Sequence, residues 1–97
     1  MFSVVCTPIK VVTRSYGKHN SWTFGDCRSS QVYESNQFYT EKCCQKPGSY
    51  PIYCVDSAKD GWHGGYLEIG GTKYCEEFKD GPVKWEEATM SKNENLS

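Results

Sequence analysis

The sequence has no long apolar run, few aliphatic residues and no excess of charge of either sign. No stretch of its 97 residues approaches the roughly 20 apolar residues that a membrane helix requires. Its 11 Lys and Arg residues and 12 Asp and Glu residues leave a net charge of −1. That balance provides no electrostatic surface for nucleic acid or an anionic membrane. We therefore expect neither a transmembrane segment nor a nucleic-acid partner.

The sequence also lacks the 3.6-residue apolar period of an amphipathic helix. Turn residues recur at short spacing between runs of β-branched and aromatic residues, which is typical of all-β domains. We expect a small disulfide-stapled antiparallel β-sandwich, jelly-roll-like and with no substantial helix, in one domain over residues 1–87. Residues 88–97, "ATMSKNENLS", are polar and predict a flexible tail. Residues 1–12 lack the pattern of a signal peptide, so we expect them to belong to the mature chain.

Cysteine spacing favours disulfides over a metal site. No C-x-x-C motif is present, and the 6 cysteines form an even set in a short chain with a thin apolar core. Zinc is the alternative, because two His and six Cys can still converge in space. Disulfides indicate a secreted, extracellular protein. The predicted disulfide residues are Cys6, Cys27, Cys43, Cys44, Cys54 and Cys75.

The order of the disulfides is partly constrained. A bridge between the adjacent Cys43 and Cys44 strains the intervening peptide, so pairings that contain it are discarded. Cys54 and Cys75 bracket a glycine-rich loop and the strand after it, which makes Cys54–Cys75 the first predicted bridge. Cys6 and Cys27 then bond to Cys43 and Cys44 in either order, and each bridge contributes about 2–4 kcal/mol.

The stretch "YLEIGGTKYC" predicts a hairpin with a two-residue turn at its paired glycines. Folding about that turn pairs Leu67 with Tyr74 on a core-like face and Glu68 with Lys73 on the other face. Cys75 would share the face of Glu68. Either a bulge intervenes or the disulfide of Cys75 runs over the outer side.

The stretch "DSAKDGWHGG", residues 56–65, combines two carboxylates with flexible glycines, as a calcium loop requires. It is not an EF-hand, because Ala58 and Leu67 occupy positions where that motif needs oxygen ligands. The alternative is that the aspartates cap turns by accepting hydrogen bonds from nearby backbone amides. We expect calcium as the cofactor, with Asp56, Asp60, Glu77 and Asp80 as ligands and with Glu76 and Asp26 also within reach.

Aromatic and imidazole side chains in and after this loop predict a binding surface made of Trp62, His63 and Tyr66. The alternative for Trp62 is that it folds back as the lid of a small core. Trp22 is expected in the core, because Phe24 shares its face of a strand. His63 is a candidate metal ligand, general base or surface residue, and no nucleophile stands out beside it. We therefore do not expect an enzyme.

The segments "SYGKHNSWTFGDC", "CCQKPGSYPIYCVDSAKDGWHGGYLEIGG" and "YCEEF" resemble a group of secreted modules, often repeated in marine invertebrate and algal proteins. Their signature is a D-S-x-G-D-G-W-x-G-G stretch after a Cys-containing strand. The resemblance covers roughly residues 15–81, and Lys59 departs from it where the group has Gly. The "GGYLEI" strand is also similar to a strand of the CUB family. Both resemblances imply an extracellular β-sandwich, and the first implies a divalent-cation loop at Asp56 and Asp60.

Taken together, these features predict a secreted, calcium-dependent binding or adhesion module. It would present residues 56–65 to a glycan or to the surface of an extracellular protein. The alternative is a small secreted toxin, inhibitor or defence protein, with the loop as its active tip.

Overall fold

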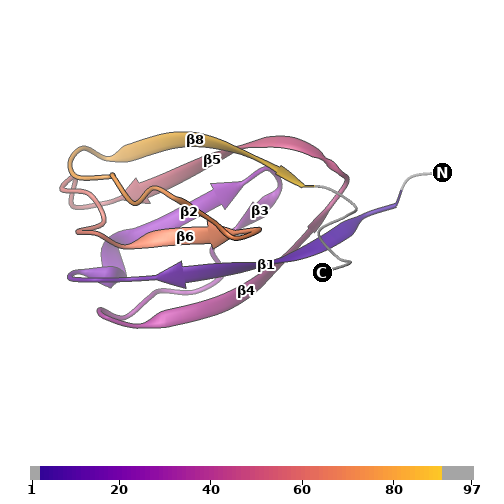
Figure 1. The fold of residues 1–97 in the computed structure, drawn as a ribbon. Coiled ribbons are helices and arrows are strands. Elements are labelled where there is room, and N and C mark those ends of the chain that lie inside the picture. Colours follow the sequence, from indigo (N-terminus) through magenta and orange to yellow (C-terminus); the bar gives the residue numbers. More distant parts are fainter. Residues whose placement is uncertain (1–2, 91–97) are drawn as a thin grey trace.

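The computed structural model describes residues 3–90, which form two packed antiparallel sheets of four strands each (Figure 1). Sheet A has the order β4-β1-β6-β7, with bounds Phe38–Gln45, Val5–Val12, Tyr66–Ile69 and Thr72–Tyr74. Sheet B has the order β3-β2-β5-β8, with bounds Cys27–Arg28, Asn20–Phe24, Gly48–Asp56 and Val83–Met90. The helical content of residues 3–90 is one short 3-10 turn, η1, at Gly17–His19. The predicted all-β, antiparallel sandwich is confirmed.

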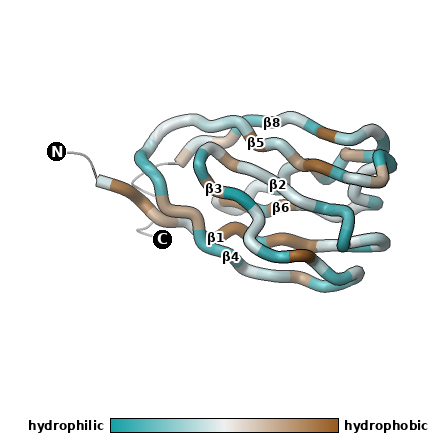
Figure 2. Tube along the Cα trace, turned by 180° about the vertical axis from the view of Figure 1, so that it is seen from behind, coloured by the Kyte–Doolittle hydropathy of each residue, from teal (hydrophilic) through white to brown (hydrophobic). Residues whose placement is uncertain are grey.

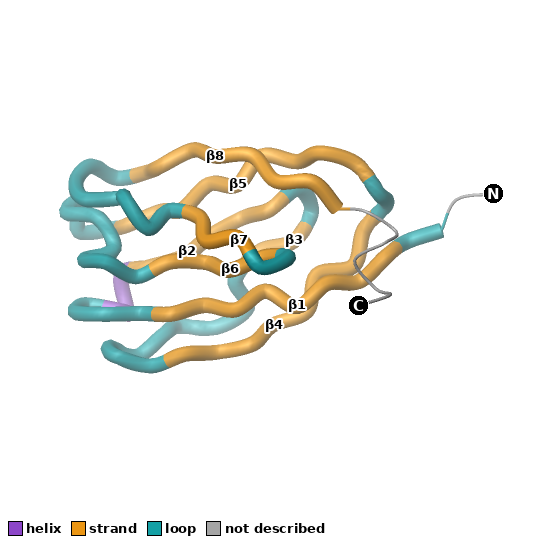
Figure 3. Tube along the Cα trace, viewed as in Figure 1, coloured by secondary structure: helices purple, strands orange, loops and turns teal. Residues whose placement is uncertain are grey.

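Most connections cross from one sheet to the other, as they do in jelly-roll-like folds. Among the strands of residues 3–90, only β2–β3 and β6–β7 are consecutive and pair within one sheet. The longer loops gather at one end of the sandwich (Figure 3). Over residues 3–90, no helix is long and apolar enough to cross a membrane.

The core between the sheets is rich in aromatic side chains, because the chain has few aliphatic ones. Trp22, Phe24 and Ile52 are almost fully buried there, as the pairing of Trp22 and Phe24 on one face predicted. Figure 2 shows brown, hydrophobic stretches along β1 in a trace that is mostly pale or teal. Strands alternate between inward apolar and outward polar residues, so half of each strand is enough to fill this thin core.

The three disulfides confirm the first predicted bridge and decide the order of the other two. Cys54 bonds to Cys75 and Cys27 bonds to Cys43, and both bridges join sheet A to sheet B. Cys6 bonds to Cys44, directly opposite on the neighbouring strand of sheet A. The order follows from the strand geometry, because successive side chains of β4 face opposite sides. Residue 43 therefore points into the core and residue 44 points out.

The β6–β7 hairpin has the predicted register, with Leu67 opposite Tyr74 and Glu68 opposite Lys73. Both glycines of its turn adopt positive φ, as the two-residue turn requires. The ladder ends at Tyr74, and Cys75 has a φ of 66° and is fully buried. A left-handed residue at the strand end therefore turns the cysteine into the core, where it reaches Cys54.

The boundary predicted for the polar tail, at residue 88, is wrong. Strand β8 continues through Ala88 to Met90, and these two side chains are 4% and 1% exposed. Glu87 and Thr89 alternate with them and face solvent, so the polar composition of the segment hid its two core residues. The rest of the predicted tail, residues 91–97, lies outside the described residues.

Candidate functional site

Asp56 ends β5 and acts as a backbone cap of the glycine-rich loop. Its side chain is 1% exposed. One carboxylate oxygen accepts a hydrogen bond from the Ala58 amide at 3.2 Å, and the other accepts one from the Asp60 amide at 2.6 Å. This is the turn-capping arrangement considered as the alternative to a calcium ligand. The buried carboxylate is thus engaged by the loop itself.

A second loop, residues 75–82, runs beside the first. Asp60 forms a parallel bridge with Gly81, and the Trp62 amide donates to the carbonyl of Phe78 at 3.0 Å. At Gly61, which has a φ of 81°, an added Cβ would lie 2.4 Å from that same carbonyl. Only glycine allows the two loops to approach this closely. Asp60 and Asp80 therefore lie at the same end of the sandwich.

The predicted calcium ligands do not converge. Within residues 3–90, no three His, Cys, Asp or Glu side chains are arranged to hold a metal ion. The Glu77 carboxylate lies 3.5 Å from the Lys79 ammonium, and the Glu76 carboxylate lies 3.8 Å from Lys73. Calcium binding stays a prediction that rests on the sequence pattern alone.

Asp26, also thought to be within reach of the loop, lies at the opposite end of the sandwich. It is in the β2–β3 turn, and its amide donates to the side chain of Gln45 at 3.0 Å. The end of β2 that lies next to the glycine-rich loop is Asn20, which is opposite Asp56 on β5. The expectation for Asp26 is therefore wrong, because β2 runs the length of the sandwich between the two positions.

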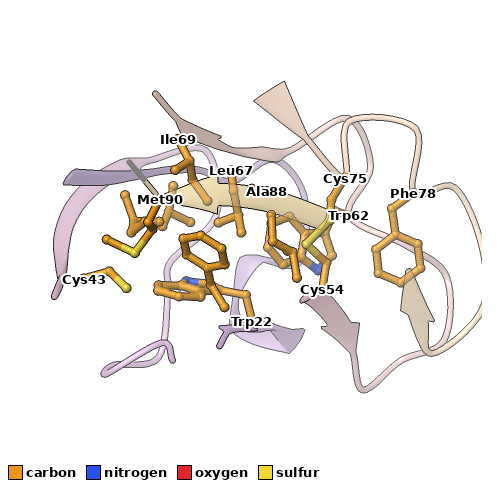
Figure 4. Packing of buried hydrophobic residues seen from close by; sticks show 14 of the residues in the cluster. Trp22, Cys43, Cys54, Trp62, Leu67, Ile69, Cys75, Phe78, Ala88 and Met90 are labelled. Atoms are coloured by element: carbon orange, nitrogen blue, oxygen red, sulfur yellow. A yellow bond between two sulfur atoms is a disulfide. The ribbon is translucent and has the colours of Figure 1, made fainter. Parts of the chain in front are cut away.

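The prediction that Trp62 contacts a ligand is wrong, and its alternative, a core lid, is confirmed. Trp62 has no exposed surface, and its indole nitrogen donates to the carbonyl of Val55 at 3.0 Å. Its ring lies 6.5 Å from that of Phe78, centroid to centroid. Figure 4 shows Trp62 and the bridge between Cys54 and Cys75 toward the same end of the core. A large aromatic closes this end because few aliphatic side chains are available to do so.

His63 remains at the surface of the loop. Its Nε2 atom lies 3.4 Å from a carboxylate oxygen of Asp60, and its ring lies 5.3 Å from that of Tyr16. The interaction with the Asp56 side chain, followed by the nearby imidazole, holds the pKa of the Asp60 carboxyl below its usual range. This His–Asp pair is a surface contact in the loop, and within residues 3–90 no nucleophile is hydrogen-bonded to it.

Tyr66, the third predicted ligand-binding residue, lies on the outer face of sheet A. The ammonium of Lys73 sits 4.6 Å from the centroid of its ring. Tyr66 follows the loop directly in sequence, but β6 carries its side chain away from the loop. The three residues predicted to form one surface are therefore distributed over the core, the loop and a sheet face.

The outer face of sheet B carries an aromatic pair that is not among the residues predicted to bind a ligand. Tyr53 on β5 and Trp85 on β8 are directly opposite each other and are 38% and 58% exposed. The indole nitrogen of Trp85 donates to the Tyr53 hydroxyl at 3.1 Å, which fixes both rings. The sequence "VKWEEATM" could have indicated that Trp85 is exposed. Residue 85 is an odd number of positions from Ala88 and Met90, so in a strand it faces the opposite side from these two buried residues.

Polar groups continue the row in which the aromatic pair lies. Across sheet B, Arg28, Thr23, Tyr53 and Trp85 are neighbours in register on four successive strands. At strand spacings of about 4.8 Å, the row is about 14 Å long. The next outward row holds Ser21, Val55 and Val83. We call the two rows together the aromatic face.

Comparison of the chain with protein family models, with curated proteins and with solved structures finds no significant match.

Proposed function

We propose that the protein is an extracellular carbohydrate-binding module whose ligand stacks on Trp85 and Tyr53 of the aromatic face. The observation that carries this proposal is the exposed, hydrogen-bonded Trp–Tyr pair on an open sheet. The domain buries Trp22 and Trp62 but leaves Tyr53 and Trp85 exposed to solvent. Large aromatic side chains that remain exposed favour a binding role. The three disulfides fit an oxidising, extracellular environment.

The composition of the face favours a sugar over a protein surface. A standard protein interface covers about 800 Å² on each partner. Two aromatic side chains supply about 150–250 Å² each even when they are completely covered. Hydroxyl and guanidinium groups of Thr23 and Arg28 lie in the same row and suit the hydroxyl groups of a sugar ring. The patch is small, flat and amphipathic, as a short stretch of polysaccharide requires.

Rigidity adds to the expected affinity. The bond between the Trp85 indole and the Tyr53 hydroxyl holds both rings before a ligand arrives. Binding then loses little side-chain entropy, a loss that otherwise costs about 0.5–1.5 kcal/mol per immobilised side chain. The sheet beneath is braced by the bridge between Cys54 and Cys75. The loop of residues 56–65, by contrast, contributes no exposed tryptophan.

The test is affinity electrophoresis and pull-down with a panel of neutral polysaccharides that includes cellulose, chitin, mannan and β-1,3-glucan. One face of the exposed part of Trp85 amounts to about 70 Å², or about 1.8 kcal/mol at ~25 cal/mol per Å². Trp85→Ala is therefore expected to weaken binding about twentyfold. Tyr53→Ala is expected to act in the same direction.

Phe38→Ala is the matched control, because Phe38 is 73% exposed on the opposite sheet. It removes an exposed aromatic without touching the aromatic face, so it should leave the affinity unchanged. Circular dichroism checks that each variant is folded. If no neutral polysaccharide is retained, or if Trp85→Ala binds as tightly as the wild type, the proposal is wrong. Repeating the assay in calcium and in chelator tests the calcium dependence expected from the sequence.

A further inference from the structure

A shallow depression lies on the outer face of sheet A, at the loop end of the sandwich. Its lining includes Lys10, Arg14, Asn36, Gln37, Phe38 and Tyr66. Its floor is a row in register across three strands, in which Val12 of β1 lies between Phe38 of β4 and Tyr66 of β6. The depression is on the opposite side of the sandwich from the aromatic face.

The charges that line the depression are all positive. Lys10 and Arg14 are exposed, and neither lies within 4.0 Å of a carboxylate of the described residues. Lys73, over the ring of Tyr66, adds a third cation nearby, although it also contacts Glu76. Glu68, opposite Lys10 in the next row, is the neighbouring acid and does not line the depression. A chain with a net charge of −1 thus concentrates unpaired cations at one place.

The aromatic rings provide apolar surface beside these cations. Phe38 is 73% exposed at the start of β4, and Tyr66 is half-buried with one side against the Lys73 ammonium. A flat apolar face next to unpaired positive groups suits a ring that carries an anionic substituent. An inorganic anion alone would not use the aromatic surface.

The rim of the depression is held in place by the backbone. The amide of Thr13 donates to the carbonyl of Gln37 at 2.9 Å, and the amide of Asn36 donates to the carbonyl of Arg14 at 3.1 Å. The buried Thr13 hydroxyl donates to the Glu34 carbonyl at 2.6 Å. These bonds tie the loop before β4 to the residues after β1. The backbone at Arg14 is therefore held at the rim of the depression.

We propose that this depression binds an acidic polysaccharide. Sugar rings lie against Phe38 and Tyr66, and their carboxylate or sulfate groups contact Lys10 and Arg14. The proposal does not depend on the aromatic face, which has no such group of unpaired cations and suits neutral sugars. With ligands on both sheets, the module would bridge an acidic and a neutral polysaccharide, as an adhesion module of a matrix does.

The experiment measures retention of the folded, oxidised protein by a sulfated polysaccharide (dextran sulfate), a carboxylated one (alginate) and neutral dextran. Retention by either acidic polymer but not by dextran is expected, and the pattern identifies the anionic group. Raising the salt from about 50 mM to 200 mM should weaken binding severalfold, since the contacts are ionic. Equal retention of the Trp85→Ala variant, which lacks the main aromatic of the other face, by all three polymers, or retention by none, would overturn the proposal.

Variants locate the site. The double variant Lys10→Ala/Arg14→Ala should lose about tenfold or more in affinity. The matched control Lys79→Ala also removes a positive charge but lies in the loop of residues 75–82, and it should stay within about twofold. If Lys79→Ala weakens binding as much as Lys10→Ala alone or Arg14→Ala alone, the effect is one of net charge and the proposal fails.

Two further variants separate this proposal from its competitors. Phe38→Ala should weaken binding of the acidic polysaccharide, whereas Trp85→Ala should leave it unchanged. Thus the failure of one binding face leaves the other testable. Poly-glutamate serves as the competitor for an acidic peptide. If it displaces the polysaccharide at equal charge concentration and Phe38→Ala has no effect, the depression recognises charge alone, and the proposal is overturned.

Discussion

Replacing Asp56 with alanine tests whether the glycine-rich loop depends on turn capping or on a metal ion. The substitution removes the acceptor for the amides of Ala58 and Asp60. Hydrogen bonds to a charged group contribute about 1.5–3 kcal/mol each, and two such bonds total about 3–6 kcal/mol. Residues 58 and 60 are themselves exposed, so water replaces part of the loss. We expect destabilisation of about 2–4 kcal/mol, which lowers the Tm of a domain of this size by about 8 °C or more.

The matched control is Asp80→Ala in the adjoining loop. Asp80 was predicted as a calcium ligand too, but it is exposed and makes no hydrogen bond or ion pair within residues 3–90. If the carboxylates act as caps, Asp56→Ala is strongly destabilising and Asp80→Ala changes the stability by less than about 0.5 kcal/mol. If the carboxylates bind a common ion, both substitutions remove the same ligand-dependent stability.

The assay is chemical unfolding of the oxidised protein, followed by tryptophan fluorescence, in millimolar calcium and in chelator. The calcium arm is informative because Asn20, the cross-strand neighbour of Asp56, has a buried side-chain amide that finds no hydrogen-bond partner among residues 3–90. A buried unpaired amide is a place where an ordered water or ion can bind. A stabilisation by calcium that both aspartate variants abolish would refute the capping argument. If Asp56→Ala lowers the free energy of unfolding by less than about 1 kcal/mol, the contribution assigned to the two capping hydrogen bonds is too large.

Two other contacts give further predictions. The buried Tyr33 hydroxyl accepts from the Trp22 indole at 2.8 Å and donates to Glu41 at 2.5 Å, so Tyr33→Phe should cost about 1–3 kcal/mol in chemical unfolding. Burial, and then the bond to Glu41, raise the pKa of Tyr33 above its unfolded value of about 10. This stabilisation is present at neutral pH and is lost as the pH rises above about 10, and Tyr33→Phe should reduce that alkaline loss. If the wild type and Tyr33→Phe lose half of their stability at the same alkaline pH, this role of the Tyr33 hydroxyl is contradicted. The Cys6–Cys44 bridge lies at the surface while the other two bridges join the sheets, so mild reductant followed by alkylation and mass spectrometry should label residues 6 and 44 first. First labelling of a bridge between the sheets would show that exposure does not control reduction.

Local patterns carried enough information to predict the elements whose partners are close in sequence. The hairpin around Gly70-Gly71 has the predicted register because a two-residue turn leaves little choice of pairing. Trp22 and Phe24 are buried together because residues two apart in a strand share a face. The Cys54–Cys75 bridge closes the segment that contains the hairpin and was predicted on that basis.

Local patterns could not predict which tryptophans are buried and which are exposed. Trp62 stands among glycines in a polar loop and is fully buried, whereas Trp85 lies in a strand and is 58% exposed. Burial of the first depends on the loop of residues 75–82 lying against it, and exposure of the second depends on the outer face of sheet B being open. Neither condition is visible within a few residues of the side chain.

By itself, the sequence determined the class of structure: an all-β domain stapled by three disulfides. Alternation along strands, turn residues and cysteine spacing are local properties, so they can be recognised without knowledge of the fold. Only the tertiary structure decided which carboxylates meet, which faces stay open, and that Phe38, Val12 and Tyr66 form one row. The reason is that strands far apart in the chain become neighbours in a sandwich whose connections cross between its sheets. Both proposed binding faces consist of residues that became neighbours in this way.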